Sequence, residues 1–162
     1  MNGSRRWRLP LALQMGLFIW RLSVPLERQG LAEFLGELAR GRRPPCGDVD
    51  RAVARLARLR RRWLRLPGFR RRDTCYTRAL VLFRFLDPGR GALRIHLGTE
   101  PPRAPGGNVH GHAWVSLDGR ILEPLPEAVA QRVLPLYVFP PETTPGQSPG
   151  PAAPERPAVS RA

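Results

Sequence analysis

The sequence predicts an α+β fold in which helices come first and a small antiparallel sheet follows. Three observations support this. Apolar residues recur every three or four positions through the first half of the chain. From residue 93 the period changes to strict alternation, which is typical of a half-buried strand. An Asp-Gly pair at 118–119 then separates two alternating runs and indicates a two-residue hairpin.

Helices are predicted over residues 10–22, 27–40 and 48–65, separated by Ser23-Val24-Pro25 and by a Pro-rich stretch at 41–45. In the third helix, arginines alternate with an apolar stripe that contains Val53, Leu56 and Trp63. We expect a solvated basic face over a packed stripe, with a dedicated polyanion site as the alternative.

Pro67-Gly68 ends the third helix, and Asp73 or Thr74 can cap the next one. Cys75 therefore falls in the first turn of a helix that runs to about residue 86. Backbone N–H groups at a helix start stabilise an anion, so a thiolate is favoured there. The arginines at 70–72 would add positive charge if they lie close.

After this helix, strands are predicted at 93–97, 112–117 and 120–124, with a loop over 101–109. Residues 133–139 form either a last strand or a helical turn. We divide the chain into an N-terminal helical region (1–66), a catalytic core (67–139) and a disordered Pro- and Ala-rich tail (140–162).

The chain has 162 residues and a formal net charge of +14, and because it contains no lysine all 27 basic residues are arginine. Such a charge attracts nucleic acid, an anionic membrane or an acidic peptide, and its sign alone does not choose among them. Two cysteines do not make a disulfide framework and fit a cytoplasmic protein. The apolar segment within 9–26 is interrupted at Gln14 and Arg21, so we expect a packed or interfacial helix and leave peripheral membrane contact open.

His112 lies on the predicted strand 112–117 and is the candidate base for Cys75. A base of this kind needs a third group that orients its ring. In the predicted hairpin, Glu123 faces Trp114 and lies diagonal to His112, about 7 Å away between backbones. Asp118 sits six residues along and is already explained by the turn, so Glu123 is the preferred third residue and Asp118 the less favoured one.

A metal site is the alternative use of these residues. His110 and His112 could join Cys75 or Cys46 around zinc, but no second closely spaced pair completes a tetrahedron. We therefore expect neither a metal nor a cofactor. Cys46 follows Pro44-Pro45 in a loop-like stretch, and we expect it to be inert.

The motifs Cys75-x-x-Arg78-Ala79-Leu80, Leu97-Gly98 and Gly111-His112-Ala113-Trp114-Val115 resemble the transglutaminase-like cysteine peptidases of lasso-peptide biosynthesis. The resemblance implies a papain-like core, Cys75 as nucleophile and His112 as base. It also implies removal of a leader from a ribosomally made precursor, with a separate leader-recognition protein and an ATP-dependent macrocyclase as partners. The family usually has aspartate as its third residue, where this chain offers Glu123.

The sequence thus predicts a cysteine peptidase that works through an acyl-thioester. Two alternatives stay open. An amine could replace water as the acceptor, as in a crosslinking transglutaminase. The chain could also be a non-catalytic basic module that binds nucleic acid or membrane, although nucleic acid is not the expected partner.

Overall fold

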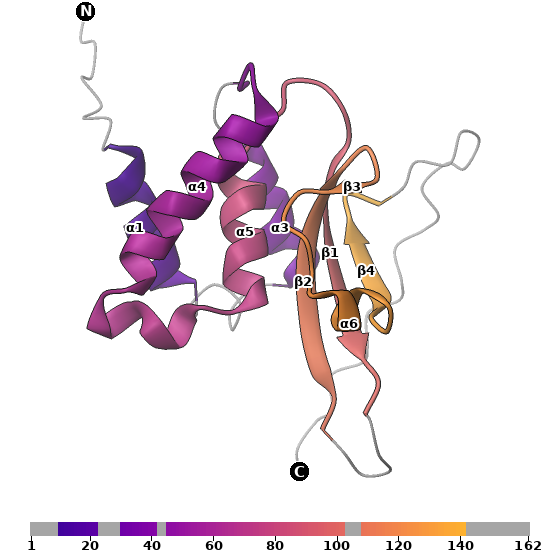
Figure 1. Cartoon of the computed structure of the whole chain (residues 1–162). Helices are drawn as coiled ribbons and strands as arrows, with labels where there is room; N and C mark the ends of the chain where they lie inside the picture. Colours follow the sequence, from indigo (N-terminus) through magenta and orange to yellow (C-terminus); the bar gives the residue numbers. More distant parts are fainter. Residues whose placement is uncertain (1–9, 23–29, 42–44, 103–107, 142–162) are drawn as a thin grey trace, which may run out of the picture.

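The helical half of the protein comes first in the chain, as predicted. The computed structural model describes residues 10–22, 30–41, 45–102 and 108–141. Figure 1 shows its helices to one side of a sheet. They are α1 (Leu11–Arg21), α3 (Leu31–Arg40), α4 (Val49–Leu64), a 3-10 helix η1 (Pro67–Arg72) and α5 (Cys75–Phe85). Residues 27–29 of the second predicted helix lie outside the described residues.

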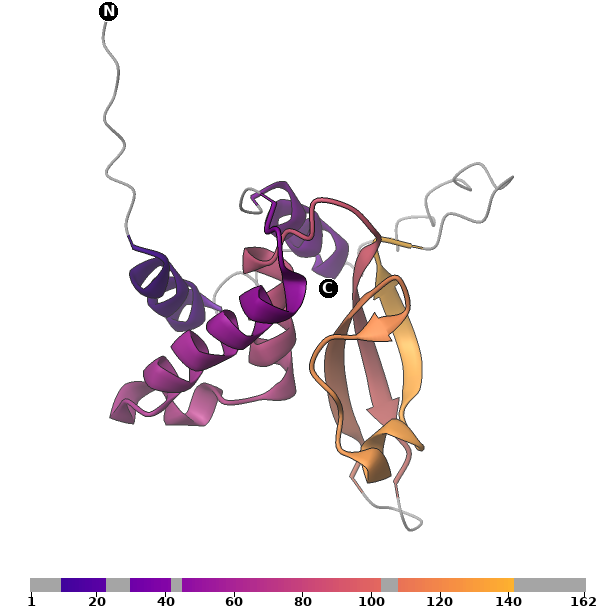
Figure 2. The same ribbon diagram turned by 45° about the horizontal axis from the view of Figure 1, so that its top comes forward.

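Four strands form one antiparallel sheet in the order β3-β2-β1-β4 (Figures 1 and 2). The strands are β1 (Leu93–Glu100), β2 (His110–Leu117), β3 (Arg120–Ile121) and β4 (Leu134–Phe139). A short helix, α6 (Glu127–Ala130), lies in the connection from β3 to β4. The predicted α+β class is confirmed, and residues 133–139 are mainly strand rather than a helical turn.

The β2–β3 hairpin has the predicted turn but a shorter second strand. Asp118 and Gly119 have φ values of 49° and 83°, as a type I′ turn requires. Ser116 pairs with Ile121, as predicted, but the ladder then ends. The predicted strand over 120–124 is therefore wrong beyond Ile121. Prolines at 124 and 126 cannot donate a ladder hydrogen bond, so a regular strand could not have reached residue 124.

Strand β1 is longer than predicted, because it extends beyond Leu97 to Glu100. Over its whole length it pairs with β2, from Leu93 opposite Leu117 to Glu100 opposite His110. Of the predicted loop, residues 103–107 lie outside the described part of the chain. The extension places Glu100 and its carboxylate opposite His110, at the start of β2.

Helix α5 lies at the centre of the hydrophobic core. Its Val81, Leu82 and Phe83 are at most 1% exposed. The core continues without interruption into α1, α3 and α4 on one side and into Ile95 and Val115 of the sheet on the other. The predicted boundary at residue 66 therefore falls within a single hydrophobic core, to which residues on both sides of it contribute.

The ends of the chain are described only in part. Of the predicted tail, residues 142–162 lie outside the described residues, as do residues 9 and 23–26 of the apolar segment at 9–26. Across the described ranges, none of the helices combines the length and the apolar character needed to span a bilayer.

Candidate active site

Cys75 is the first residue of α5, and Thr74 is the N-cap of this helix. The Thr74 hydroxyl accepts a hydrogen bond from Thr77 N at 3.2 Å, while Arg78 N donates to Thr74 O at 3.1 Å. The backbone N–H groups of Cys75 and Tyr76 have no acceptor among the described residues. Two free donors therefore lie beside the sulfur, where an oxyanion would form.

A cavity of about 430 Å³ opens at Cys75. Because β3 pairs with β2 only at Ser116 and Leu117, β2 has an open edge at His112, and the cavity lies along this edge. The helices form one wall and the β3–β4 connection forms the other. The lining residues are Arg60, Cys75, Arg78, Ala79, Leu82, His112, Ala113, Trp114, Val115, Glu123, Pro124, Leu125, Pro126 and Val129.

The start of α5 lies directly against β2. Cys75 Sγ is 3.5 Å from the carbonyl oxygen of Gly111, the residue before His112. A Cβ added at Gly111 would lie 2.5 Å from the Tyr76 hydroxyl oxygen. A side chain at this position would displace the Tyr76 hydroxyl from its present place. The close contact of β2 with the start of α5 brings the cysteine and the histidine to one cavity.

The carboxylate beside His112 belongs to Glu100 of β1. His112 Nε2 lies 3.6 Å from Glu100 Oε2, which is an ion-pair distance when the ring is protonated. This separation exceeds a hydrogen bond, and such contacts commonly tighten when a substrate binds. Both side chains are largely buried, with 18% of His112 and 7% of Glu100 exposed. Arg132 NH1 contacts the other Glu100 oxygen at 3.2 Å.

Glu100 reaches His112 along a diagonal of the β1–β2 ladder. Gly98 is opposite His112, and Glu100 is two residues further along β1. Glu100 on β1 therefore has the diagonal position relative to His112 that the sequence predicted for Glu123 on the strand after the hairpin. Sequence reasoning missed Glu100. The alternation of β1, continued past Leu97, places it on the face of His96, but nothing in the sequence sets the register with β2 across the long connection.

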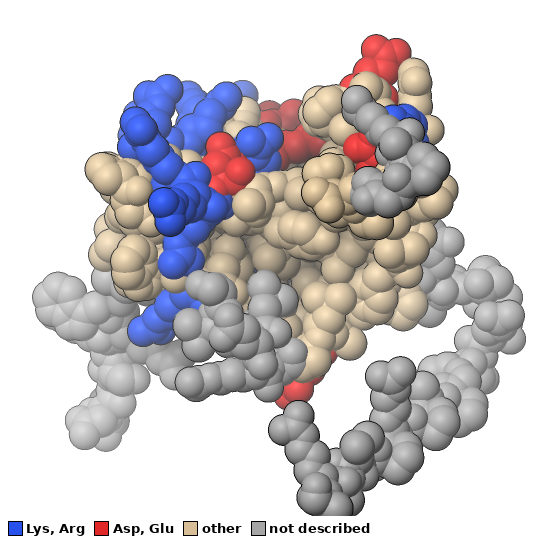
Figure 3. Space-filling model, turned by 90° about the horizontal axis from the view of Figure 1, so that it is seen from below, with Lys and Arg blue, Asp and Glu red and all other residues tan. Residues whose placement is uncertain are grey.

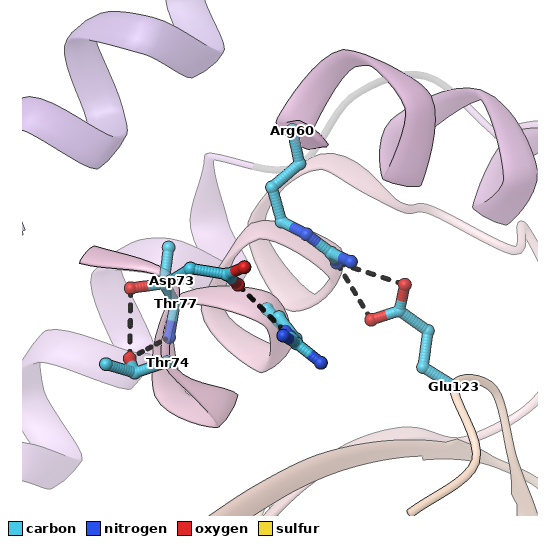
Figure 4. A network of polar contacts seen from close by, with 6 residues as sticks. Arg60, Asp73, Thr74, Thr77 and Glu123 are labelled. Atoms are coloured by element: carbon cyan, nitrogen blue, oxygen red, sulfur yellow. Dashed lines mark hydrogen bonds and ion pairs between the residues drawn. The ribbon is translucent and has the colours of Figure 1, made fainter. Parts of the chain in front are cut away.

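Glu123 lines the cavity but binds a different partner. Arg60 NH1 donates to both of its carboxylate oxygens, at 2.8 and 3.0 Å, as Figure 4 shows. The β2–β3 ladder ends before residue 123, so the predicted Trp114–Glu123 pair does not form in it. The structure thus brings Cys75, His112 and Glu123 to one cavity, with the Glu123 carboxylate directed to α4.

Asp118 lies at the end of β2 away from His112. Its carboxylate accepts a hydrogen bond from Ala92 N at 2.8 Å, and its own N–H donates to Ala92 O. These bonds hold the hairpin turn against the start of β1. They give Asp118 a structural role.

Arg78 lines the cavity and brings positive charge to it. Of the arginines predicted to add charge there, at 70–72, at least Arg72 binds another part of the protein. Arg72 donates to the carbonyls of Ile19 and Trp20 and so caps the end of α1. Arg78 Nε bonds Asp73 at 3.0 Å (Figure 4). This hydrogen bond, and then the negative charges of Asp73 and Glu123, raise the pKa of Arg78.

Cys46 has a different environment. It packs half-buried against the core, and its backbone N–H donates to Asp87 O at 2.8 Å. Burial raises the pKa of the Cys46 thiol, which reduces the thiolate fraction at neutral pH. His110 is exposed at the start of β2. In the part of the chain that the structure covers, no three His, Cys, Asp or Glu side chains are grouped as metal ligands.

A cysteine at a helix start beside a histidine on a neighbouring strand defines the thiol class of acyl-transfer sites. The comparison with protein families agrees. The family model of the transglutaminase-like superfamily matches residues 16–137, from α1 to β4. The chain therefore belongs to the transglutaminase-like superfamily, which generally comprises cysteine peptidases and acyltransferases. Searches of curated proteins and of solved structures give no match.

Proposed function

We propose that this protein is a thiol peptidase that removes the leader from a ribosomally made, lasso-type precursor peptide. The observation that carries the proposal is the joint position of Cys75 and His112 at one cavity, with the sulfur 3.5 Å from Gly111 O. Leader removal is supported by the resemblance of the Gly111–Val115 block to lasso-peptide leader peptidases.

In the first half-reaction, Cys75 Sγ attacks the carbonyl carbon of the scissile amide while His112 takes the thiol proton. The resulting oxyanion accepts hydrogen bonds from the free N–H groups of Cys75 and Tyr76. The C–N bond then breaks, and His112 protonates the leaving amine, which is the new N-terminus of the core peptide. The leader remains bound to Cys75 as a thioester.

In the second half-reaction, His112 takes a proton from water, whose oxygen attacks the thioester. The C–S bond breaks, the thiolate recovers the proton, and the leader departs with a new carboxyl group.

Glu100 is the orienting residue of this mechanism. Its carboxylate faces Nε2 of His112, which leaves Nδ1 to exchange the proton with Cys75. A buried carboxylate also stabilises the imidazolium that forms in each half-reaction. Glu123, bound by Arg60, instead shapes the cavity wall.

The test uses the purified full chain with a lasso-type precursor peptide, with and without a leader-recognition protein, in H₂¹⁸O. We expect two fragments, with one ¹⁸O in the new leader carboxyl group by mass spectrometry. Cys75→Ala and His112→Ala should give no fragments, whereas Cys46→Ala should cleave like the wild type. Cleavage by Cys75→Ala would refute the mechanism.

The acceptor is tested in the same assay by adding glycine methyl ester or cadaverine. Hydrolysis predicts an unchanged ¹⁸O-labelled leader, whereas a leader–amine adduct as the main product would show a transglutaminase. A precursor and a macrocyclase gene next to this one would support the proposed partners. The absence of both genes would count against the lasso assignment.

A further inference from the structure

Helix α1 carries an exposed apolar stripe. Leu13, Leu17 and Trp20 follow one another at spacings of four and three, and so share one face of the helix. They are 38%, 43% and 54% exposed. Leu66, just after α4, is 46% exposed.

The packing of α1 on α4 makes these side chains one surface. Trp63 Nε1 donates to Ala12 O at 2.7 Å, and the Trp63 ring comes within 2.5 Å of where a Cβ of Gly16 would lie. A shallow hollow between the two helices is lined by Ala12, Leu59, Arg62, Trp63 and Leu66. Trp20 contacts Phe69 of η1, with ring centroids 5.6 Å apart. The stripe therefore adjoins both α4 and η1.

The same two elements carry a dense group of arginines. Residues 51–72 contain ten arginines and no carboxylate. Arg60 is bound to Glu123, and Arg72 caps α1. The others are exposed: Arg51, Arg55, Arg58, Arg61, Arg62, Arg65, Arg70 and Arg71. Of these eight, only Arg51 forms a salt bridge within the described ranges. Figure 3 shows basic side chains gathered in a band on one side of the molecule.

We propose that this surface docks the protein on an anionic membrane. Leu13, Leu17, Trp20 and Leu66 would enter the boundary between headgroups and acyl chains, while the surrounding arginines contact lipid phosphates. Nucleic acid would satisfy the arginines but would leave Leu13 and Leu17 without a role, because aliphatic side chains neither stack well on bases nor contact phosphate. Arg60 is buried and bound to Glu123, and none of the other residues of this surface lines the catalytic cavity, so the cavity is separate from it.

The test is flotation of the full chain with vesicles of phosphatidylcholine alone or mixed with phosphatidylglycerol. The wild type should float only with the anionic vesicles. Leu13→Gln/Leu17→Gln and, separately, Arg62→Gln/Arg65→Gln should each weaken binding about tenfold or more. The matched control is Leu136→Gln/Arg90→Gln, which removes an exposed leucine and an exposed arginine elsewhere and should change binding less than about twofold.

Circular dichroism establishes that each variant is folded, and none of the substituted residues lines the catalytic cavity, so precursor cleavage in solution should be retained. Failure to bind anionic vesicles would overturn the proposal. A second result would also overturn it. If raised salt and the arginine substitutions abolish vesicle binding while the leucine variant still binds like the wild type, the surface is a general polyanion site.

Discussion

Two glutamates near the candidate nucleophile have separate partners. Glu100 lies against His112 and Arg132, whereas Glu123 lies against Arg60. The charge of Glu100 is therefore placed to act on the imidazole. The charge of Glu123 is placed to neutralise a buried guanidinium.

Replacing each glutamate with glutamine should separate these roles. Glu100→Gln should lower kcat for precursor cleavage by roughly 10²- to 10⁴-fold at nearly unchanged KM, because the imidazolium loses its stabilising charge and its orientation. Glu123→Gln should keep kcat within about tenfold of the wild type at temperatures well below unfolding. Steady-state kinetics on both variants checks this.

The comparison also decides between the two candidates for the third residue. If Glu123→Gln shows the larger loss of kcat while remaining folded, the sequence-based choice of Glu123 is right and Glu100 has only a structural role. Equal losses would show that neither carboxylate acts alone.

At the scale of elements, glycines allow two close approaches between neighbouring elements. Gly111 admits the Tyr76 hydroxyl and so lets β2 meet the start of α5. Gly16 admits the Trp63 ring and so lets α1 lie against α4. Trp63 cannot easily move away, because its indole N–H is bonded to Ala12 O. These positions depend on the absence of a side chain rather than on a special backbone conformation.

Gly16→Ala should therefore destabilise the protein although alanine favours a helix. A Cβ at this position would lie 2.5 Å from two atoms of the Trp63 ring. We expect a loss of about 1–3 kcal/mol in the free energy of unfolding from overpacking. Equilibrium urea unfolding measures it.

The matched variant is Gly36→Ala in α3, where the closest atom to the added Cβ is the end of the Arg40 side chain at 3.9 Å. There only helix propensity acts, and stability should rise by about 0.5–1 kcal/mol. Equal effects of the two substitutions would show that the α1–α4 contact is not tightly packed.

At the scale of the whole molecule, the Arg60–Glu123 pair joins the helical half to the connection that follows β3. Arg60 is 7% exposed and Glu123 is 25% exposed, so the pair is mostly shielded from water. By contrast, the Arg120–Asp50 pair joins the same two halves at the surface, where both side chains are more than half exposed. Only the buried pair should matter for stability.

Glu123→Gln should lower the free energy of unfolding by about 1–3 kcal/mol, because it leaves the Arg60 charge buried and unneutralised. The double variant Arg60→Met/Glu123→Leu should return to within about 1 kcal/mol of the wild type, since it removes both charges and keeps the volume. Arg120→Gln, the exposed control, should change stability by less than about 0.5 kcal/mol. A double variant no more stable than Glu123→Gln would contradict this account.

Local patterns predicted most elements of the fold. The three- and four-residue spacing gave the helices at 10–22 and 48–65 to within one residue at each end, and the Asp118-Gly119 pair gave the hairpin turn. The errors have one local and one long-range cause. Prolines at 124 and 126 exclude a regular strand to residue 124, and pairing with β2 and β4 extends β1 beyond its alternating apolar run.

The sequence alone determined the α+β class, the cysteine at a helix start and the histidine on a strand, because each of these follows from short-range periodicity, capping and turn chemistry. Only the tertiary structure decided which carboxylate faces His112 and which binds Arg60. That choice depends on the register of β1 against β2 and on the packing of α4, and both join residues separated by long connections whose alignment no local pattern specifies.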